Sequence, residues 1–219
     1  MTSTTQTTYP MTSCSVSLNG AGKKFNREWI FREMNFHFEA GKSYAITGPN
    51  GSGKSTLLQC IAGSCLLSEG NLIFIDGKRN AISEDRIYQF ISFAAPYLEL
   101  IEEMTPLEFL RFHLRFKPLL PGTTLENILA LAQLEAAANK QIRFFSSGMK
   151  QRLKLLQAFY SDVPVILLDE PCTNLDCTGF EFYKALCEGP GKNRLTIIGS
   201  NDPEETEHCV GHIHLPDYR

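Results

Sequence analysis

Residues 48–56, which read GPNGSGKST, have the composition and spacing needed to bind phosphate groups, because they satisfy the pattern G-x-x-x-x-G-K-[ST]. Glycines let such a loop turn its backbone N–H groups toward one point, where the N-terminus of a following helix also attracts anions. Lys54 can reach the β- and γ-phosphates of a nucleotide, and the Ser55 hydroxyl is a suitable ligand for Mg²⁺. The residues expected to contact the nucleotide are Gly48, Pro49, Asn50, Gly51, Ser52, Gly53, Lys54, Ser55 and Thr56.

Two adjacent carboxylates, Asp169 and Glu170, follow a continuous apolar stretch (VPVILL, 163–168) that predicts a buried strand. At the end of that strand Asp169 is suited to hold Mg²⁺, directly or through water. Glu170 points elsewhere and can polarise an attacking water molecule. An acidic pair is also typical of the start of a helix, but the phosphate loop upstream favours the metal and water roles.

A third polar group follows the β-branched stretch TIIG (196–199), in the sequence SND (200–202). Residues after a parallel strand face the usual ligand-binding edge of an α/β sheet. Asn201 is therefore either a plain cap of the following helix, whose start reads DPEE, or a side chain that faces a ligand. Ser200 and Asp202 are also suited to the capping role.

The elements that position these groups follow from hydrophobic spacing. Residues 14–47 alternate as antiparallel strands, 70–78 form a strand ending in an Asp-Gly turn, and further strands are expected within 87–105, 164–169 and 195–200. Helical spacing follows the phosphate loop and covers about 97–160 and 179–188, with Thr105 and Thr124 as N-caps. The pattern predicts an α/β fold of the P-loop NTPase class, with an antiparallel β-subdomain and an α-helical subdomain.

Composition excludes some classes of partner. The 219 residues carry a net charge of −3, which gives no general attraction to nucleic acid, and no apolar run approaches the roughly 18–20 residues that span a membrane. Residues 1–13 lack the basic start and apolar stretch of a secretory signal and are expected to form a disordered polar tail. The seven cysteines lack CxxC spacing and are expected to be reduced thiols.

Between the two phosphate motifs, FSSGM (145–149) precedes a basic amphipathic helix and resembles the LSGGQ signature of ABC-type ATPases. ILLDEP (166–171) and TNLD (173–176) are similar to the corresponding segments of that family, and the resemblance covers roughly 14–212. Phe145, Ser147 and Met149 depart from the usual Leu, Gly and Gln, but Ser147 keeps a small side chain and a backbone N–H. The resemblance implies an ABC-type nucleotide-binding domain over 14–215, with its helical subdomain at about 97–160.

The resemblance also implies a mechanism. Members of this family bind ATP and Mg²⁺ and work as head-to-tail pairs, in which the signature of one domain faces the phosphate loop of the other. The catalytic groups would be Lys54, Glu170 and Asn201. The metal ligands would be Ser55 and Asp169. The nucleotide-binding residues that reach across the interface would be Ser146, Ser147, Gly148, Met149 and Asp176. Asp176 would also help to couple the two sites.

The same resemblance implies the partners and the location. A second nucleotide-binding domain is expected to pair with this one when ATP binds, and a homodimer is expected, although nothing in the sequence identifies the partner domain as the same chain. Separate transmembrane subunits are expected to hold the chain at the inner, cytoplasmic face of the cell membrane. No nucleic acid is expected as a partner.

Two positions depart from the family pattern. The strand before the helical segment usually ends in Gln, but alignment of ISFAAP puts Pro96 or Ala95 there, and neither side chain can bind Mg²⁺ or orient water. Family members also usually carry His where this chain has Asn201, whose neutral amide can hydrogen-bond phosphate but cannot carry charge. Slow ATP hydrolysis is therefore expected. The nearby acids, which either substitute for the Gln or face solvent or a partner, are Glu99, Glu102 and Glu103.

Three further groups have alternative interpretations. Phe25 is expected to stack on adenine, with Trp29 as the alternative and a position in the core as the other explanation for Phe25. An apolar patch at 97–101, beside the acids, is expected to form a groove for a membrane subunit. The spacing of His208, His212 and His214 suggests a metal site, but a strand with alternating side chains explains it better.

Together these features predict an ATP-binding and hydrolysing subunit that powers an ABC transporter by ATP-driven dimerisation. The chain also resembles small ATPases that serve haem or cytochrome-assembly exporters, although nothing in it identifies the cargo or the direction of transport. The alternatives are an ATP-gated switch with little hydrolysis and a non-transport ABC protein. Non-transport members usually have long coiled coils or tandem P-loops, and this sequence has neither.

Overall fold

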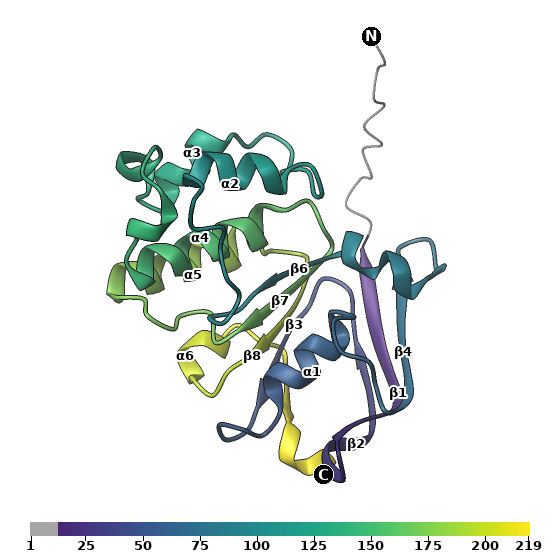
Figure 1. Cartoon of the computed structure of the whole chain (residues 1–219). Helices are drawn as coiled ribbons and strands as arrows, with labels where there is room; N and C mark the ends of the chain where they lie inside the picture. The colour runs from purple at the N-terminus through teal and green to yellow at the C-terminus, as the bar shows by residue number, and fades with distance from the viewer. Residues whose placement is uncertain (1–12) are drawn as a thin grey trace.

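The computed structural model describes residues 13–219, so that residues 1–12 of the expected tail lie outside the described residues. The described chain forms two sheets with helices packed around them (Figure 1). A parallel sheet runs in the order β6-β7-β8-β3-β9, and an antiparallel sheet in the order β2-β1-β4-β5. The expected α/β fold, with an antiparallel sheet beside a parallel one, is confirmed.

The parallel sheet consists of short strands. Its members are β6 (Ile91–Ala94), β7 (Val165–Asp169), β8 (Leu195–Gly199), β3 (Ser43–Thr47) and β9 (Gly211–His214). Every residue of β7 and β8 is buried, as expected for apolar strands that are covered on both faces. Neighbouring side chains point to opposite faces of the sheet, so Leu167 joins one hydrophobic core and Leu168 joins the other.

The antiparallel sheet consists of β1 (Cys14–Phe25), β2 (Glu28–Phe38), β4 (Glu69–Asp76) and β5 (Ala81–Ile82). The predicted strand at 70–78 and its Asp-Gly turn are confirmed by the β4–β5 pair. The expectation that all of 14–47 is antiparallel is wrong for Ser43–Thr47, which is β3 and pairs in parallel with β8 and β9. The physical reason is burial on both faces, since Tyr44, Ala45 and Ile46 are all buried.

Helices cover both faces of the parallel sheet (Figure 1). On one face, α1 (Lys54–Ile61) shares a core with the antiparallel sheet. On the other face, α4 (Ser147–Tyr160) and α5 (Cys177–Glu188) form a second core, which extends to α2 (Pro106–His113) and α3 (Leu125–Leu131). The short α6 (Pro203–Thr206) follows β8. None of the helices in residues 13–219 is long and apolar enough to cross a membrane.

The boundaries of the helical segment are partly as predicted. Thr105 and Thr124 are confirmed as N-caps, because their hydroxyls accept hydrogen bonds from backbone N–H groups three residues later, at 3.3 and 3.2 Å. The helix that begins at Leu125 is shorter than its apolar pattern indicates, since Gln133 has a φ of 58° and interrupts helical geometry. The strand expected within 87–105 covers only Ile91–Ala94.

Candidate active site

The predicted phosphate loop connects the end of β3 to the start of α1, so the N-terminus of α1 faces the loop. Gly53, the N-cap of α1, has a φ of 105°, in the region that favours glycine. A Cβ atom at this position would lie 2.1 Å from Cγ2 of Ile30 on β2. Both the backbone geometry and the close approach of β2 therefore require glycine here.

A hollow opens over this loop. The residues that line it are Ile30, Asn50, Gly51, Gly53, Lys54, Ser55, Thr56 and Glu170. The structure thus brings most of the predicted loop residues together with Glu170, while Gly48, Pro49 and Ser52 belong to the loop but not to the lining. Ile30 was missed, because no motif marks it and only the packing of β2 against Gly53 places it at the site.

Lys54 is only 5% exposed, and its Nζ donates hydrogen bonds to the carbonyl oxygens of Gly48 at 2.7 Å and Pro49 at 3.4 Å. A buried ammonium group needs such acceptors, and charged phosphate oxygens accept more strongly than neutral carbonyls. The Oγ of Ser52 is buried in the same loop and has no hydrogen-bond partner among the described residues. The loop therefore offers a charged group to an anion and contains a buried hydroxyl without a partner within residues 13–219.

Asp169 lies at the carboxyl end of β7 and is 2% exposed. Burial raises the pKa of its carboxyl group, and the hydroxyls of Ser55 and Tyr97 partly offset this effect. Its Oδ2 is buried and has no hydrogen-bond partner within residues 13–219. Mg²⁺ prefers hard oxygen ligands, and the unpartnered carboxylate oxygen of Asp169 together with the Ser55 hydroxyl can supply them. The residues present therefore fit this metal.

Glu170 differs from Asp169 in being exposed to the hollow. Its φ of 41° is uncommon for a residue other than glycine, and its backbone N–H donates to the carbonyl of Gly199 at 2.9 Å. The carboxylate accepts a hydrogen bond from Thr173 Oγ1 at 3.4 Å. An exposed carboxylate held at the edge of a phosphate-binding hollow can accept a proton from water.

Asn201 lies beside the first residue of the phosphate loop, and its Oδ1 accepts a hydrogen bond from the backbone N–H of Gly48 at 2.9 Å. Because a backbone N–H can only donate, the amide presents its oxygen here, and its NH₂ group is directed elsewhere. The cap of α6 is Asp202, whose Oδ1 accepts from Glu204 N at 2.9 Å. Asn201 is therefore attached to the loop and is not the helix cap.

The FSSGM segment starts α4, where Ser146 is the N-cap and its Oγ accepts from Met149 N at 3.2 Å. A second hollow lies here, and the predicted residues in its lining are Ser146, Ser147, Gly148, Met149 and Asp176. Asp176 accepts hydrogen bonds from Arg152 Nη2 at 2.9 Å and from Gly179 N at 2.8 Å. The two hollows share no lining residue, so one chain does not bring its signature residues to its own phosphate loop.

The two aromatic candidates lie on the β1–β2 hairpin, outside the lining of the phosphate-loop hollow. Phe25 is 49% exposed, which excludes the core interpretation, and Lys23 Nζ lies 4.8 Å from its ring centroid. Trp29 is flanked by Lys24 Nζ at 5.1 Å and by Arg32 Cζ at 4.6 Å. A role for Phe25 in stacking on adenine stays a prediction.

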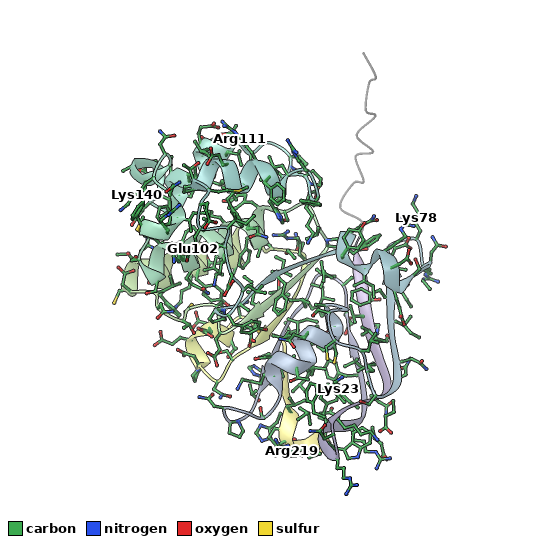
Figure 2. The ribbon with its side chains drawn as sticks, in the orientation of Figure 1. Lys23, Lys78, Glu102, Arg111, Lys140 and Arg219 are labelled. Carbon is green, nitrogen blue, oxygen red and sulfur yellow. The ribbon has the colours of Figure 1, made fainter. Side chains whose placement is uncertain are left out.

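The loop after β6 contains Ala95 and Pro96 and leads into a groove. Its lining consists of Pro96, Tyr97, Leu98, Glu99, Leu100, Glu102, Glu103, Lys150 and Lys154. Glu102 pairs with Lys150, and Figure 2 shows Glu102 on the helical side of the molecule, whereas Lys78 projects from the antiparallel sheet. None of the three acids lines the phosphate-loop hollow, so their predicted alternative as metal ligands gains no support from their position.

The histidines and cysteines follow the simpler interpretations. Among residues 13–219, no group of three or more His, Cys, Asp or Glu side chains could hold a metal ion. His212 and His214 are exposed residues of β9, in agreement with the alternating-strand explanation. All seven cysteines are free thiols.

Comparison with known proteins agrees with this geometry. Residues 31–173 match the family model described as ABC transporter. The cytochrome c biogenesis ATP-binding export protein CcmA of Xanthomonas campestris pv. campestris (strain 8004) is 37% identical over 183 residues, which cover 80% of this chain and 82% of that protein. The sulfate/thiosulfate import ATP-binding protein CysA of Synechocystis sp. is 34% identical and covers 74% of this chain, which spans 46% of CysA.

Solved structures show the same fold at lower identity. A putative ABC transporter ATP-binding protein from Pyrococcus furiosus superposes with a TM-score of 0.77 at 18% identity, covering 93% of this chain and 98% of that one. A bacterial Atm1-family ABC exporter with ATP bound gives a TM-score of 0.76 at 18% identity, covering 94% of this chain and 38% of that one.

The fold and the phosphate-binding hollow define an ATPase of the P-loop class. The family match and the 37% identity are more specific, and the chain belongs to the ABC transporter family. It is an ATP-binding subunit with ATPase activity that powers an ABC transporter.

Proposed function

We propose that two copies of this chain pair head to tail and hydrolyse ATP between them. Each copy would offer its phosphate loop to one nucleotide and the N-terminus of α4 to the other. The observation that carries this proposal is that the phosphate-loop hollow and the signature hollow have no residue in common. A helix N-terminus such as that at Ser147 favours anions. In the proposed pair this anion is the γ-phosphate of the ATP bound at the phosphate loop of the second copy.

Each residue of the phosphate-loop hollow has a role in this proposal. Lys54 binds the β- and γ-phosphates, and the backbone N–H groups of the loop hold the rest of the phosphate chain. Ser55 and Asp169 hold Mg²⁺, which neutralises charge on the phosphates when bound. Glu170 accepts a proton from the attacking water as its oxygen bonds to the γ-phosphorus, so that the bond to the bridging oxygen breaks and ADP and phosphate form.

Slow turnover follows from the residues near the γ-phosphate. The chain has no Gln at position 95 or 96, and Asn201 uses its amide oxygen to accept from Gly48 N at 2.9 Å. A neutral amide cannot supply the charge of a protonated His. The same bond favours the second candidate function, a switch that pairs on ATP binding and hydrolyses little, since Asn201 couples the β8 end to the loop without ionising.

The partners proposed for the chain are separate transmembrane subunits, which would hold it at the inner face of the cell membrane. The groove beside 97–101 is suited to them, because it combines apolar side chains with acids. Glu102 is paired with Lys150, while Glu99 and Glu103 have no ion-pair partner within residues 13–219. We therefore expect the docking segment to carry basic residues. The proposed ATP-binding domain covers 14–215, with its helical part at about 97–160.

Phosphate release by the purified chain, with and without Mg²⁺, tests the function. We expect Mg²⁺-dependent turnover that the variant Glu170→Gln lowers about 10²- to 10³-fold, with ATP binding retained. Glu181→Gln, an exposed change of the same kind on α5, is the control and should turn over ATP like the wild type. Equal turnover in Glu170→Gln and wild type would contradict the role of Glu170. Mg²⁺-dependent pairing with hardly any turnover in the wild type would favour the switch.

A further inference from the structure

The three residues after β7, which are Glu170, Pro171 and Cys172, belong to neither a helix nor a strand. Glu170 N donates to Gly199 O at 2.9 Å, and Glu170 O accepts from Thr173 N at 3.2 Å. The carbonyl of Cys172 also accepts from a backbone N–H, and Pro171 has no N–H to donate. Two groups of this loop, the Pro171 carbonyl and the Cys172 N–H, therefore need partners from side chains.

Two buried side chains from different helices supply these partners. Gln151 of α4 is 2% exposed, and its Nε2 donates to Pro171 O at 2.7 Å. Glu205 of α6 is 4% exposed, and its Oε1 accepts from Cys172 N at 2.8 Å. A buried backbone group without a partner costs folding free energy, so each side chain holds the loop where its bond can form. The loop after β7 is thus held by α4 and by α6.

Glu205 is an unusual residue for such a buried position. Its Oε2 is also buried and has no hydrogen-bond partner within residues 13–219. Its backbone carbonyl accepts from the hydroxyl of Tyr183 on α5 at 2.8 Å, which attaches α6 to α5. Burying a carboxylate with one oxygen unpartnered is unfavourable, so packing alone does not explain an acid here. The bond that its other oxygen accepts from the loop does give the acid a role.

Glu170 depends on this loop for its direction. Its φ of 41° lies in a region that residues other than glycine rarely adopt, and such a conformation persists only where the surrounding structure fixes it. Its carboxylate accepts only a long hydrogen bond, from Thr173 Oγ1 at 3.4 Å, among the described residues. The backbone of the loop therefore decides where the Glu170 carboxylate points in the hollow that it lines.

We propose that Glu205 is a positioning residue of the ATPase: by accepting the Cys172 N–H it fixes the loop and directs the Glu170 carboxylate into the phosphate-loop hollow. Gln151 supports the same loop from α4. This proposal rests on the proposed function, because it requires Glu170 to accept a proton from the attacking water. Glu205 does not line the hollow and acts through Glu170.

Steady-state ATP hydrolysis by the full chain tests the proposal. Glu205→Leu removes the acceptor but keeps a side chain of similar size. We expect kcat to fall about 10- to 100-fold, because a displacement of about 1 Å caused by a remote change can cost 10²-fold. KM should stay within about twofold, since other residues bind the nucleotide.

Two variants at and beside this position serve as controls. Glu205→Gln keeps an oxygen that can accept from Cys172 N, so its kcat should stay within about threefold of the wild type. Glu204→Leu makes the matched change at the neighbouring residue of α6, whose side chain is exposed, and should turn over ATP like the wild type. A loss in Glu205→Gln as large as that in Glu205→Leu would contradict the acceptor role.

The route through Glu170 is tested by combining variants. Once Glu170→Gln has removed the carboxylate, its direction no longer matters, so adding Glu205→Leu should not lower the residual turnover further. Gln151→Leu should lower kcat in the wild-type background and likewise add nothing to Glu170→Gln. An additional loss of about 10-fold or more in the double variant with Glu205→Leu would overturn the claim that Glu205 acts through Glu170.

Hydrogen exchange of the Cys172 amide gives a readout that needs no nucleotide. Exchange should become faster in Glu205→Leu and stay slow in Glu205→Gln, because only the second keeps an acceptor. Urea unfolding shows which variants are folded. If Glu205→Leu does not fold, Gln151→Leu provides the same comparison of kcat with KM from the other side of the loop.

The outcomes distinguish this proposal from the function on which it rests. If the wild type shows no Mg²⁺-dependent turnover, or Glu170→Gln turns over ATP like the wild type, the proposed function fails. If Glu170→Gln lowers turnover but Glu205→Leu keeps the wild-type kcat, the proposal for Glu205 fails and the function stands. A lowered kcat in Glu205→Leu that Glu205→Gln restores supports the proposal.

Discussion

The phosphate-loop side and the signature hollow of this chain differ in how their polar groups are satisfied. In the phosphate loop and at the end of β7, Ser52 Oγ and Asp169 Oδ2 are buried without partners among the described residues, and Lys54 is bonded only to backbone carbonyls. At the signature, Arg152 and Asp176 pair with each other at 2.9 Å. The phosphate-loop side therefore has groups that gain from a charged ligand and a metal, whereas the signature hollow presents a helix N-terminus beside side chains that already have partners.

This difference indicates which side binds the nucleotide and which side completes the site. Buried polar groups without partners are suited to bind a phosphate or a cation, because the ligand removes their desolvation cost. The signature hollow, in which Arg152 and Asp176 already pair with each other, contributes its shape and the backbone N–H groups at the start of α4. We therefore expect the chemistry at the phosphate-loop side, with the signature hollow of the second copy completing it in the proposed pair.

Outside the phosphate-loop hollow, the largest effect is expected from a change that breaks the signature side alone. Ser147→Arg places a long cationic side chain in the signature hollow, and we expect turnover to fall about 100-fold, the loss typical of removing a preorganised phosphate-stabilising group. ATP binding by the single chain should stay within about twofold, because Ser147 is absent from the phosphate-loop lining and distant sites act independently.

Ser83→Arg provides the control for this variant. Ser83 is exposed just after β5, so the same charge is added far along the chain from both motifs. Phosphate release and titration of a fluorescent nucleotide measure the two effects. Wild-type turnover in Ser147→Arg would contradict any part for the signature hollow in the reaction.

A smaller effect is expected at Asn201, which joins the β8 end to the phosphate loop. Asn201→Ala leaves Gly48 N without its acceptor and removes the amide beside the loop. Turnover should fall about 10- to 100-fold, the range for leaving a buried donor without its acceptor, with a smaller change in ATP affinity. Steady-state kinetics together with equilibrium binding measure both. If affinity falls as much as turnover, Asn201 shapes the loop and does not act in the reaction.

How much of the site could be predicted depends on whether its chemistry requires a fixed local spacing. The phosphate loop, Asp169 and Glu170 were predictable, because a phosphate cradle and a strand-end carboxylate are local patterns. Ile30 was not, since its place over Gly53 depends on packing between β2 and α1. Tyr97 was assigned only to a groove, because the hydrogen bond that its hydroxyl accepts from Gln59 Nε2 at 3.3 Å joins residues 38 positions apart in the sequence.

The fold shows the same limit. The alternation at 14–25 and 28–38 identified the antiparallel strands, but local pattern does not reveal that Ser43–Thr47 leaves that sheet for the parallel one. The choice between capping and loop binding for Asn201 also could not be made locally. It depends on Gly48, which lies 153 positions away in the sequence.

The smallest expected effect separates the two regions by pH. His113 of α2 contacts Ser161 Oγ through Nε2 at 2.9 Å and Gln157 Nε2 through Nδ1 at 3.2 Å. Gln157 belongs to α4, the helix that begins in the signature segment. Burial lowers the pKa of His113 to about 4, and the charge of Lys117 adds to this. An unfolded His has a pKa near 6.5, so below that pH the unfolded state binds more protons and stability falls until about pH 4.

Urea unfolding of the wild type and of His113→Gln at pH 7 and pH 5 measures how much folding stability is lost on acidification because of His113. We expect the wild type to lose about 1–2 kcal/mol more than the variant between these two values. Hydrogen exchange should show the loss in α2 and α4 before the phosphate loop. Equal losses in both proteins would show that His113 does not make the helical side sensitive to acid.

The central claim is that ATP is held between the phosphate loop of one copy and the signature of another, and the mass of the protein in solution tests it most directly. The variant Glu170→Gln, which should retain ATP, is predicted to double from the 24.6 kDa of one chain when ATP and Mg²⁺ are added. The double variant Glu170→Gln with Ser147→Arg should bind ATP and remain at the mass of one chain. A Glu170→Gln chain that binds ATP yet stays single, or a double variant that pairs as readily, would contradict the account.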